Sequence, residues 1–193
     1  MTSHATRHLL ASGVTLFAVV LSIPPLRALI EQSMVWHMVI QMPLLVAAGW
    51  LFARALPPST ALLRCNRMGL TSAIASQLIL AYWMLPLAID HAIVLPLSDM
   101  SKILSLLLCG FTLRDTFLRA PAVVQIFFAG YNASMLLGLG LYFIKTEQRL
   151  CNAYSQDSQI STGLGLIALV VLTAALWLVS FLTRTVSEHS GKS

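Results

Sequence analysis

Long apolar runs separated by short polar connections dominate the pattern along the chain. Each run holds about 20 residues, which at a rise of about 1.5 Å per residue is enough to cross a hydrocarbon core about 30 Å thick. The pattern predicts six transmembrane helices, at Leu9 to Ala28, Met34 to Leu56, Met68 to Leu87, Met100 to Leu118, Ala122 to Ile144 and Gly163 to Leu182. We therefore expect an all-α fold, a polytopic membrane helix bundle that forms a single domain over residues 1–193.

Composition supports this interpretation. Hydrophobic residues make up 58% of the chain and charged residues 10%, and the mean hydropathy is +0.82, as is typical of an integral membrane protein. The first apolar run resembles a secretory signal, but the segment that follows it has no small-x-small cleavage site. We expect it to be a retained first helix.

Arginine and lysine are unevenly distributed between alternate connections. If the N-terminus is inside, the inner segments hold eight of them: Arg7, Arg54, Arg64, Arg67, Arg114, Arg119, Arg184 and Lys192. The outer segments hold four: Arg27, Lys102, Lys145 and Arg149. Because short cytoplasmic loops keep positive charge, the bias predicts that both termini are cytoplasmic. The same rule explains the net charge of +5 without a nucleic-acid partner, which would need a basic face on a soluble surface.

Polar residues within or beside the spans gather on the predicted outer side. They are Glu31, His37, Gln41, Asp90, His91, Asp99 and Lys102. A charge at the centre of a membrane helix costs roughly 2.5 to 3.5 kcal/mol on insertion scales, so such groups are candidates for function. Lys102 follows Asp99 by three residues, and we expect these two side chains to neutralise each other on one helix face.

Methionine and histidine share one stripe of the second predicted helix. Met34, Met38 and Met42 lie at i, i+4 and i+8, beside a row that contains His37. Thioether sulfur is a soft ligand suited to Cu(I), and imidazole also accepts copper. The candidate metal ligands on this side are His37, Met34, Met38, Met84, Asp90, His91 and Asp99, with Met100 as a further candidate.

Two alternatives to a copper site stay open. Methionine commonly fills irregular helix interfaces, and His37 would serve a structural role if it were hydrogen-bonded to a neighbour such as Glu31 or Asp99. A haem held by His37 and His91 is a weaker alternative. The three cysteines, Cys65, Cys109 and Cys151, form no thiolate metal pattern.

Three further features concern packing and chemistry. Pro86 and Pro96 bracket a stretch after the third span that we expect to be an interfacial lip rather than one unbroken helix. In the fifth span Gly130, Ser134 and Gly138 form a small-xxx-small face that would let another helix come close. No nucleophile with a base, phosphate-binding loop or H-E-x-x-H pattern is visible in the sequence, so an enzyme is not predicted.

The order of these motifs resembles the cytochrome c oxidase assembly factors usually called CtaG. That family has an H-M-x-x-H-M stretch at the outer start of a helix, and "SMVWHM", residues 33–38, matches it at His37 and Met38. A W-x-x-P-x-x-x-D segment follows in the family, and "WMLPLAID", residues 83–90, matches its Trp, Pro and Asp. The third motif, H-x-x-E-H-x-S-F leading to glycine, is matched only at Ser105 and Gly110.

The resemblance covers the second to fourth predicted helices. It implies copper handling on the outer face of a bacterial inner membrane, in aid of oxidase maturation. His37 and Met38 carry this implication, with Asp90 and Asp99 in support, while the other histidines of the family patterns are replaced, one of them by Ser33. The alternative is a non-catalytic accessory subunit of a larger respiratory, monooxygenase or photosynthetic membrane complex. The expected partners are membrane lipid and another membrane protein complex.

Overall fold

The structure is a computed structural model that describes Gly13, residues 32–55, Asn66, residues 68–151 and residues 153–190. All regular elements in these residues are helices, which confirms the predicted all-α fold class. The elements are η1 (Trp36–Gln41), α3 (Met42–Ala55), α5 (Leu70–Trp83), α6 (Pro86–Val94), α7 (Pro96–Arg119), α8 (Ala122–Lys145) and α9 (Gln156–Ser190). The predicted first span, Leu9 to Ala28, lies outside the described residues apart from Gly13.

Four segments in the described part of the chain are long and apolar enough to cross a membrane. They are Trp36–Arg54, Pro96–Arg119, Ala122–Lys145 and Gln156–Leu176. The pair α5 and α6 would add a fifth span if its two helices, which are bent by 74°, are counted together. The coarse prediction of a multi-span membrane protein therefore agrees with the helices that the structure describes.

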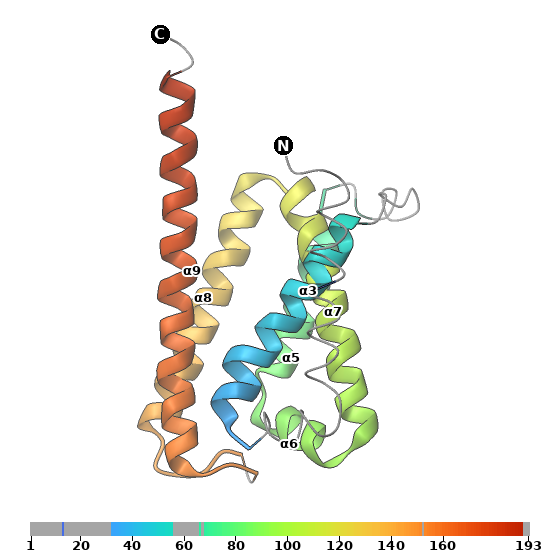
Figure 1. Cartoon of the computed structure of the whole chain (residues 1–193), viewed down its shortest axis with the longest axis vertical. Helices are drawn as coiled ribbons and strands as arrows, with labels where there is room; N and C mark the ends of the chain where they lie inside the picture. The colour runs from blue at the N-terminus through green and yellow to red at the C-terminus, as the bar shows by residue number, and fades with distance from the viewer. Residues whose placement is uncertain (1–12, 14–31, 56–65, 67, 152, 191–193) are drawn as a thin grey trace.

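The predicted third span, Met68 to Leu87, is wrong at its C-terminal end. The helix α5 ends at Trp83, and after the bend the chain forms α6, which lies across one end of the bundle (Figure 1). The prediction that the stretch between Pro86 and Pro96 is not one unbroken helix is also wrong, because α6 runs from Pro86 to Val94. Pro86 lies in the first turn of α6, where a missing N–H breaks no helical hydrogen bond, so it starts this helix instead of preventing it.

Two other helices begin earlier than predicted. α7 starts at Pro96 instead of Met100, again with proline in its first turn, and this places Asp99 in that turn. α9 starts at Gln156 instead of Gly163. Hydropathy alone misses these two helix starts because most of their residues are polar, although they continue each helix beyond its apolar run.

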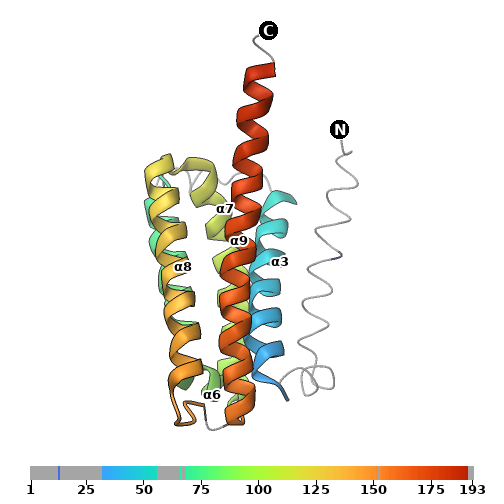
Figure 2. The same ribbon diagram turned by 90° about the vertical axis from the view of Figure 1, so that its left-hand side faces the viewer.

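The helices α3, α7 and α9 run in one direction and α5 and α8 run in the other (Figure 1). We call the end of the bundle where η1 and α7 begin the His37 end, and the opposite end, where α7 finishes, the Arg114 end. α8 and α9 lie side by side, and α9 also contacts η1 (Figure 2). The connection between α8 and α9 therefore lies at the His37 end, beside α6 (Figure 1).

Glycines set the closest helix contacts. A Cβ at Gly110 of α7 would lie 1.9 Å from the carbonyl oxygen of Val46 in α3. Between α8 and α9, a Cβ at Gly163 would lie 2.5 Å from the carbonyl oxygen of Gly140. Only glycine permits backbones to approach this closely.

The predicted small-residue face of α8 does not make such a contact within the described chain. No heavy atom of the described residues lies within 4 Å of a Cβ built at Gly130 or Gly138. The α8–α9 contact instead uses Gly140, on another side of the helix. The face of Gly130, Ser134 and Gly138 is thus open among the described residues.

Candidate functional site at the His37 end

A π-helical turn positions His37. In η1 the N–H of Met42 donates to the carbonyl oxygen of His37, five residues earlier. Pro43 follows immediately; it has no N–H to donate and its ring would crowd the carbonyl of Val39, so a widened turn fits this sequence. The turn buries His37, Met38 and Gln41 on the inside of the bundle.

Side chains from two other elements hold the imidazole of His37. Its Nε2 lies 3.2 Å from Nζ of Lys102 in α7, and its Nδ1 lies 3.0 Å from the hydroxyl oxygen of Tyr154 in the α8–α9 connection. His37 and Lys102 are both 0% exposed. The site therefore joins three segments that are far apart in the sequence.

Lys102 is also paired with Asp99. Its Nζ lies 2.7 Å from Oδ1 of Asp99, and this confirms the predicted i, i+3 ion pair. A lysine ammonium can only donate hydrogen bonds, so Nε2 of His37 accepts and the ring proton lies on Nδ1, which donates to Tyr154. We call Asp99, Lys102, His37 and Tyr154 the His37 centre.

The α8–α9 connection covers this end of the bundle. The Sγ of Cys151 contacts the carbonyl oxygen of Pro86 at 3.8 Å, and the N–H of Ala153 points to Oδ1 of Asp90 at 3.5 Å. Burial, and to a lesser degree the negative charge of Asp90, raises the pKa of Cys151 to about 12. The thiol is therefore protonated at neutral pH and is a poor metal ligand, because metals bind the thiolate.

The predicted methionine ligands are part of the apolar core. Met34, Met38 and Met42 are 0%, 3% and 5% exposed and belong to the main cluster of buried hydrophobic residues. The backbone N–H of Met34, just before η1, donates to Oγ of Ser158 at 3.0 Å, and this bond links the segment to the start of α9. This burial agrees with the alternative prediction that the three methionines fill a helix interface.

The remaining candidate ligands are dispersed. Met84 is half-buried where α5 ends, and Met100 is exposed on α7. Asp90 is half-buried and His91 is exposed, both on α6. Because both ring nitrogens of His37 contact other side chains and His91 is exposed, the geometry lends no support to a haem between them.

The fit of the His37 centre to a metal ion is poor in this arrangement. Within the described residues no group of three or more histidine, cysteine, aspartate or glutamate side chains is placed to hold one. A metal at Nε2 of His37 would also have to displace the ammonium of Lys102, which supplies a positive charge at that position. The copper site stays a prediction, and the centre as described is an ionic hydrogen-bonded cluster.

A second polar cluster lies at the Arg114 end, between α5 and α7. The carboxylate of Asp115 accepts hydrogen bonds from Asn66, from Ser72 and from Arg119. One turn deeper, Ser76 and Thr112 share a hydrogen bond of 2.8 Å between their hydroxyl oxygens. Such bonds between membrane helices stabilise their packing, and each group here has a partner within the protein.

Sequence analysis identified part of the His37 centre and missed the rest. His37, Asp99 and the Asp99–Lys102 pair were all expected, but Tyr154 was not. It lies 117 residues from His37. Its signal in the sequence was weak, because it is one tyrosine in a short connection that was predicted to lie on the same side as the other polar residues.

Comparison of the chain with protein-family models, with curated proteins and with solved structures finds no match. The resemblance to the CtaG family thus stays a prediction that depends on the quoted motifs. Any functional conclusion has to come from the arrangement of the residues themselves.

Proposed function

We propose that this chain is a non-catalytic accessory component that assembles with another protein in the membrane. The observation that carries the proposal is the open face of α8, formed by Gly130, Ser134 and Gly138. No described atom lies within 4 Å of a Cβ at either glycine. Small residues at four-residue spacing let a second membrane helix approach closely, and such packing drives association in lipid.

The His37 centre supports the same proposal in a different way. Its charged and polar groups bind one another across η1, α7 and the α8–α9 connection, so they fix the shape of this end of the bundle. A centre of this kind suits a protein that presents a rigid surface. In the proposed arrangement the chain crosses a cell inner membrane several times, with the Arg114 end and both termini on the cytoplasmic side.

Co-purification tests the proposal. Full-length protein is extracted from its native membrane into nanodiscs, and a second membrane protein should accompany it in a fixed ratio. Replacing Gly138 by leucine should lower the amount of that protein at least tenfold, because the added side chain separates the helices. Ala129→Leu is the matched control, since Ala129 is exposed on another side of α8, and it should retain the partner.

Two results would contradict the proposal. One is a wild-type protein that runs alone at its own mass after gentle extraction. The other is a partner that remains at full ratio in Gly138→Leu, which would mean that contact is made elsewhere and that the α8 face simply faces lipid.

Copper handling at the His37 end is a second proposal. The observation that favours it is the burial of His37 and Met38 on one π-helical turn, with Met34 buried just before it; this type of turn is frequent at functional sites. Thioethers with one imidazole form a donor set suited to Cu(I). The proposal requires Lys102 to leave Nε2 of His37 when copper binds.

Metal analysis after loading with Cu(I) tests this second proposal. If it holds, wild-type protein should retain about one copper ion per chain, and His37→Ala should retain at least tenfold less. His91→Ala is the matched control and should bind like the wild type, because His91 is exposed on α6. Absence of copper in the wild-type protein would exclude His37 as a copper ligand.

A further inference from the structure

The short helix α6 carries a stripe of exposed apolar side chains. Leu87 and Val94 are 66% and 73% exposed, and exposed His91 lies between them in the sequence. Because neighbours in this set are three or four residues apart, all three share one face of the helix. The other side of α6 is buried, through Ala88, Ile89 and Ala92. The stripe therefore faces whatever surrounds this end of the bundle, which is water, lipid or another protein.

The length of α5 determines how deep α6 lies. α5 has 14 residues and rises about 21 Å, which is less than a hydrocarbon core of about 30 Å. α7 has 24 residues and rises about 36 Å, which is enough to cross it. At the Arg114 end the two helices are level, because a Cβ at Gly69, just before α5, would lie 2.8 Å from the backbone nitrogen of Ala120, just after α7. α5 therefore ends before it reaches the level at which α7 begins.

A hydrogen bond marks the depth at which α5 ends. Nε1 of Trp83, its last residue, donates to Oγ of Ser105 at 2.7 Å. Ser105 lies nine residues into α7 from Pro96, so α5 stops about 13 Å short of the start of α7. α6 leads from one helix to the other and is bent by 74° from α5. It thus lies beside the first turns of α7 and not beyond them.

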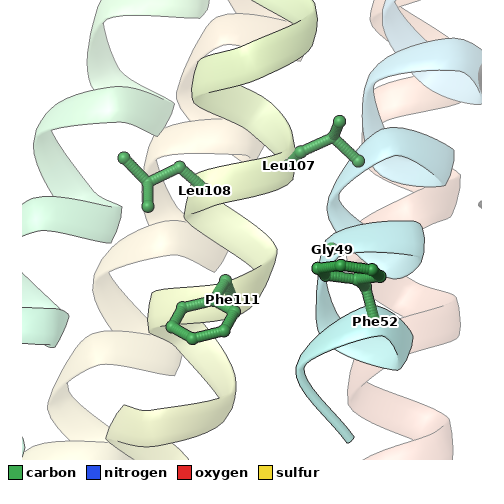
Figure 3. Close-up of a pocket in the computed structure, with 5 residues that line it drawn as sticks. All are labelled: Gly49, Phe52, Leu107, Leu108 and Phe111. Atoms are coloured by element: carbon green, nitrogen blue, oxygen red, sulfur yellow. The ribbon is translucent and has the colours of Figure 1, made fainter. Parts of the chain in front are cut away.

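Exposed apolar residues continue from α6 along both neighbouring helices. On α7, Leu104 and Leu108 are exposed, and Leu108 projects away from α3 (Figure 3). On α5, Leu78 and Tyr82 are exposed one turn apart. Every aspartate and lysine between residues 70 and 108 is buried or half-buried, namely Asp90, Asp99 and Lys102. The exposed surface of α5, α6 and α7 is therefore apolar at the depth of α6, as is typical of a surface that contacts lipid.

The two connections at the His37 end differ in character. The α8–α9 connection exposes Glu147, Gln148 and Arg149, side chains that are normally in water. The segment from α5 to α7 exposes leucine and valine at the same end. Aromatic residues of the kind that settle at the membrane–water boundary are exposed there on three helices: Trp36, Tyr82 and Tyr142. The boundary therefore lies close to α6, with the α8–α9 connection on its water side.

We propose that α6 is embedded in the bilayer leaflet at the His37 end, with Leu87 and Val94 in contact with lipid acyl chains. Helices of this kind lie in the membrane plane, with their apolar residues about 5 to 10 Å below the headgroups. In this position α5 and α6 together replace one complete span. Lipid suits the stripe better than a protein does, because α7 exposes Leu104 at the same depth.

Spin labels measure the position of α6 in full-length protein reconstituted into vesicles of phosphatidylethanolamine and phosphatidylglycerol. Leu87→Cys and Val94→Cys are labelled one at a time in a variant whose three native cysteines are replaced by alanine. Collisions with oxygen, which concentrates in hydrocarbon, are compared with collisions with a nickel chelate, which stays in water. At both positions the ratio of oxygen to nickel collisions should exceed the ratio at Arg149→Cys by about threefold or more, as a depth of about 5 to 10 Å requires.

Leu104→Cys is the matched lipid-facing control on α7 and should give a ratio at least as high as the α6 positions. A ratio at positions 87 and 94 equal to that at position 149 would show that water covers α6. Low collision rates with both reagents would show that a protein covers it. Either result would overturn the proposal.

Photo-crosslinking supplies a second measurement that keeps the native cysteines. p-Benzoylphenylalanine in place of Leu87 should form a phospholipid adduct on illumination, and the same group in place of Arg149 should form about tenfold less. A cross-link from position 87 to a second protein chain, or no adduct there, would contradict the proposal. These outcomes are independent of the proposed accessory function, which depends on α8 and not on α6.

Discussion

Replacing Asp99 by alanine is expected to lower the free energy of unfolding by about 3 to 5 kcal/mol. Lys102 is 0% exposed and lies 2.7 Å from the Asp99 carboxylate. Without that carboxylate the buried ammonium would lose the acidic partner 2.7 Å away, and removing one partner of a buried ion pair costs far more than the intact pair contributes. Unfolding of the purified protein in mixed micelles with increasing SDS, followed by circular dichroism, measures the change.

A double replacement separates the ion pair from the fold. Asp99→Leu with Lys102→Met removes both charges. The free energy of unfolding of this double variant should lie within about 1 to 2 kcal/mol of the wild-type value, and the remaining difference reflects the lost hydrogen bond to His37. Glu147→Ala, at an exposed position of the α8–α9 connection, should change stability by less than about 0.5 kcal/mol. An Asp99→Ala protein as stable as the Glu147→Ala control would contradict the prediction.

Apolar length predicted the spans because a lipid core imposes a minimum length on every helix that crosses it. It could not predict α6, because prolines at Pro86 and Pro96 signal a helix start as well as a helix end. It also placed the start of α9 at Gly163, since the polar first turns from Gln156 are held by tertiary hydrogen bonds. One of these joins Gln159 Nε2 to the carbonyl oxygen of Phe143.

The candidate site was predictable to the extent that its interactions are local. Asp99 and Lys102 lie one turn apart, so helix geometry predicted their ion pair. Tyr154 and Lys102 reach His37 only through the packing of three separate segments, and no periodicity encodes that contact. A stripe of metal ligands and a stripe of core residues would have the same helical spacing, so the sequence could not distinguish them for the methionine row. Burial places the row in the core.

The glycines show the same limit of sequence reasoning. Spacing drew attention to Gly130 and Gly138, which touch nothing among the described residues, while the closest contacts are made by Gly49 and Gly110. A small residue only permits close approach, and the partner's position decides whether the approach occurs. Because the two pairs of glycines differ in contacts but not in residue type, the same substitution at each should have opposite effects.

Gly110→Ala is expected to destabilise the protein by about 2 to 3 kcal/mol. The new Cβ would lie 1.9 Å from the carbonyl oxygen of Val46 and 2.7 Å from the backbone nitrogen of Trp50, so α3 and α7 must separate. That separation would also disturb the contact between the rings of Trp50 and Phe117, whose centroids are 5.6 Å apart. The helical preference of alanine over glycine, worth up to about 1 kcal/mol, offsets only part of the cost.

Gly138→Ala supplies the matched control, because the same methyl group on α8 meets no described atom within 4 Å. In the isolated chain it should leave the free energy of unfolding unchanged or raise it by up to about 1 kcal/mol. Unfolding in mixed micelles compares the two variants directly. Equal effects at both positions would contradict the α3–α7 contact. A stable Gly138→Ala protein with a destabilised Gly110→Ala protein would show that the internal packing depends on α3 and α7, and that the α8 face is free to contact a partner.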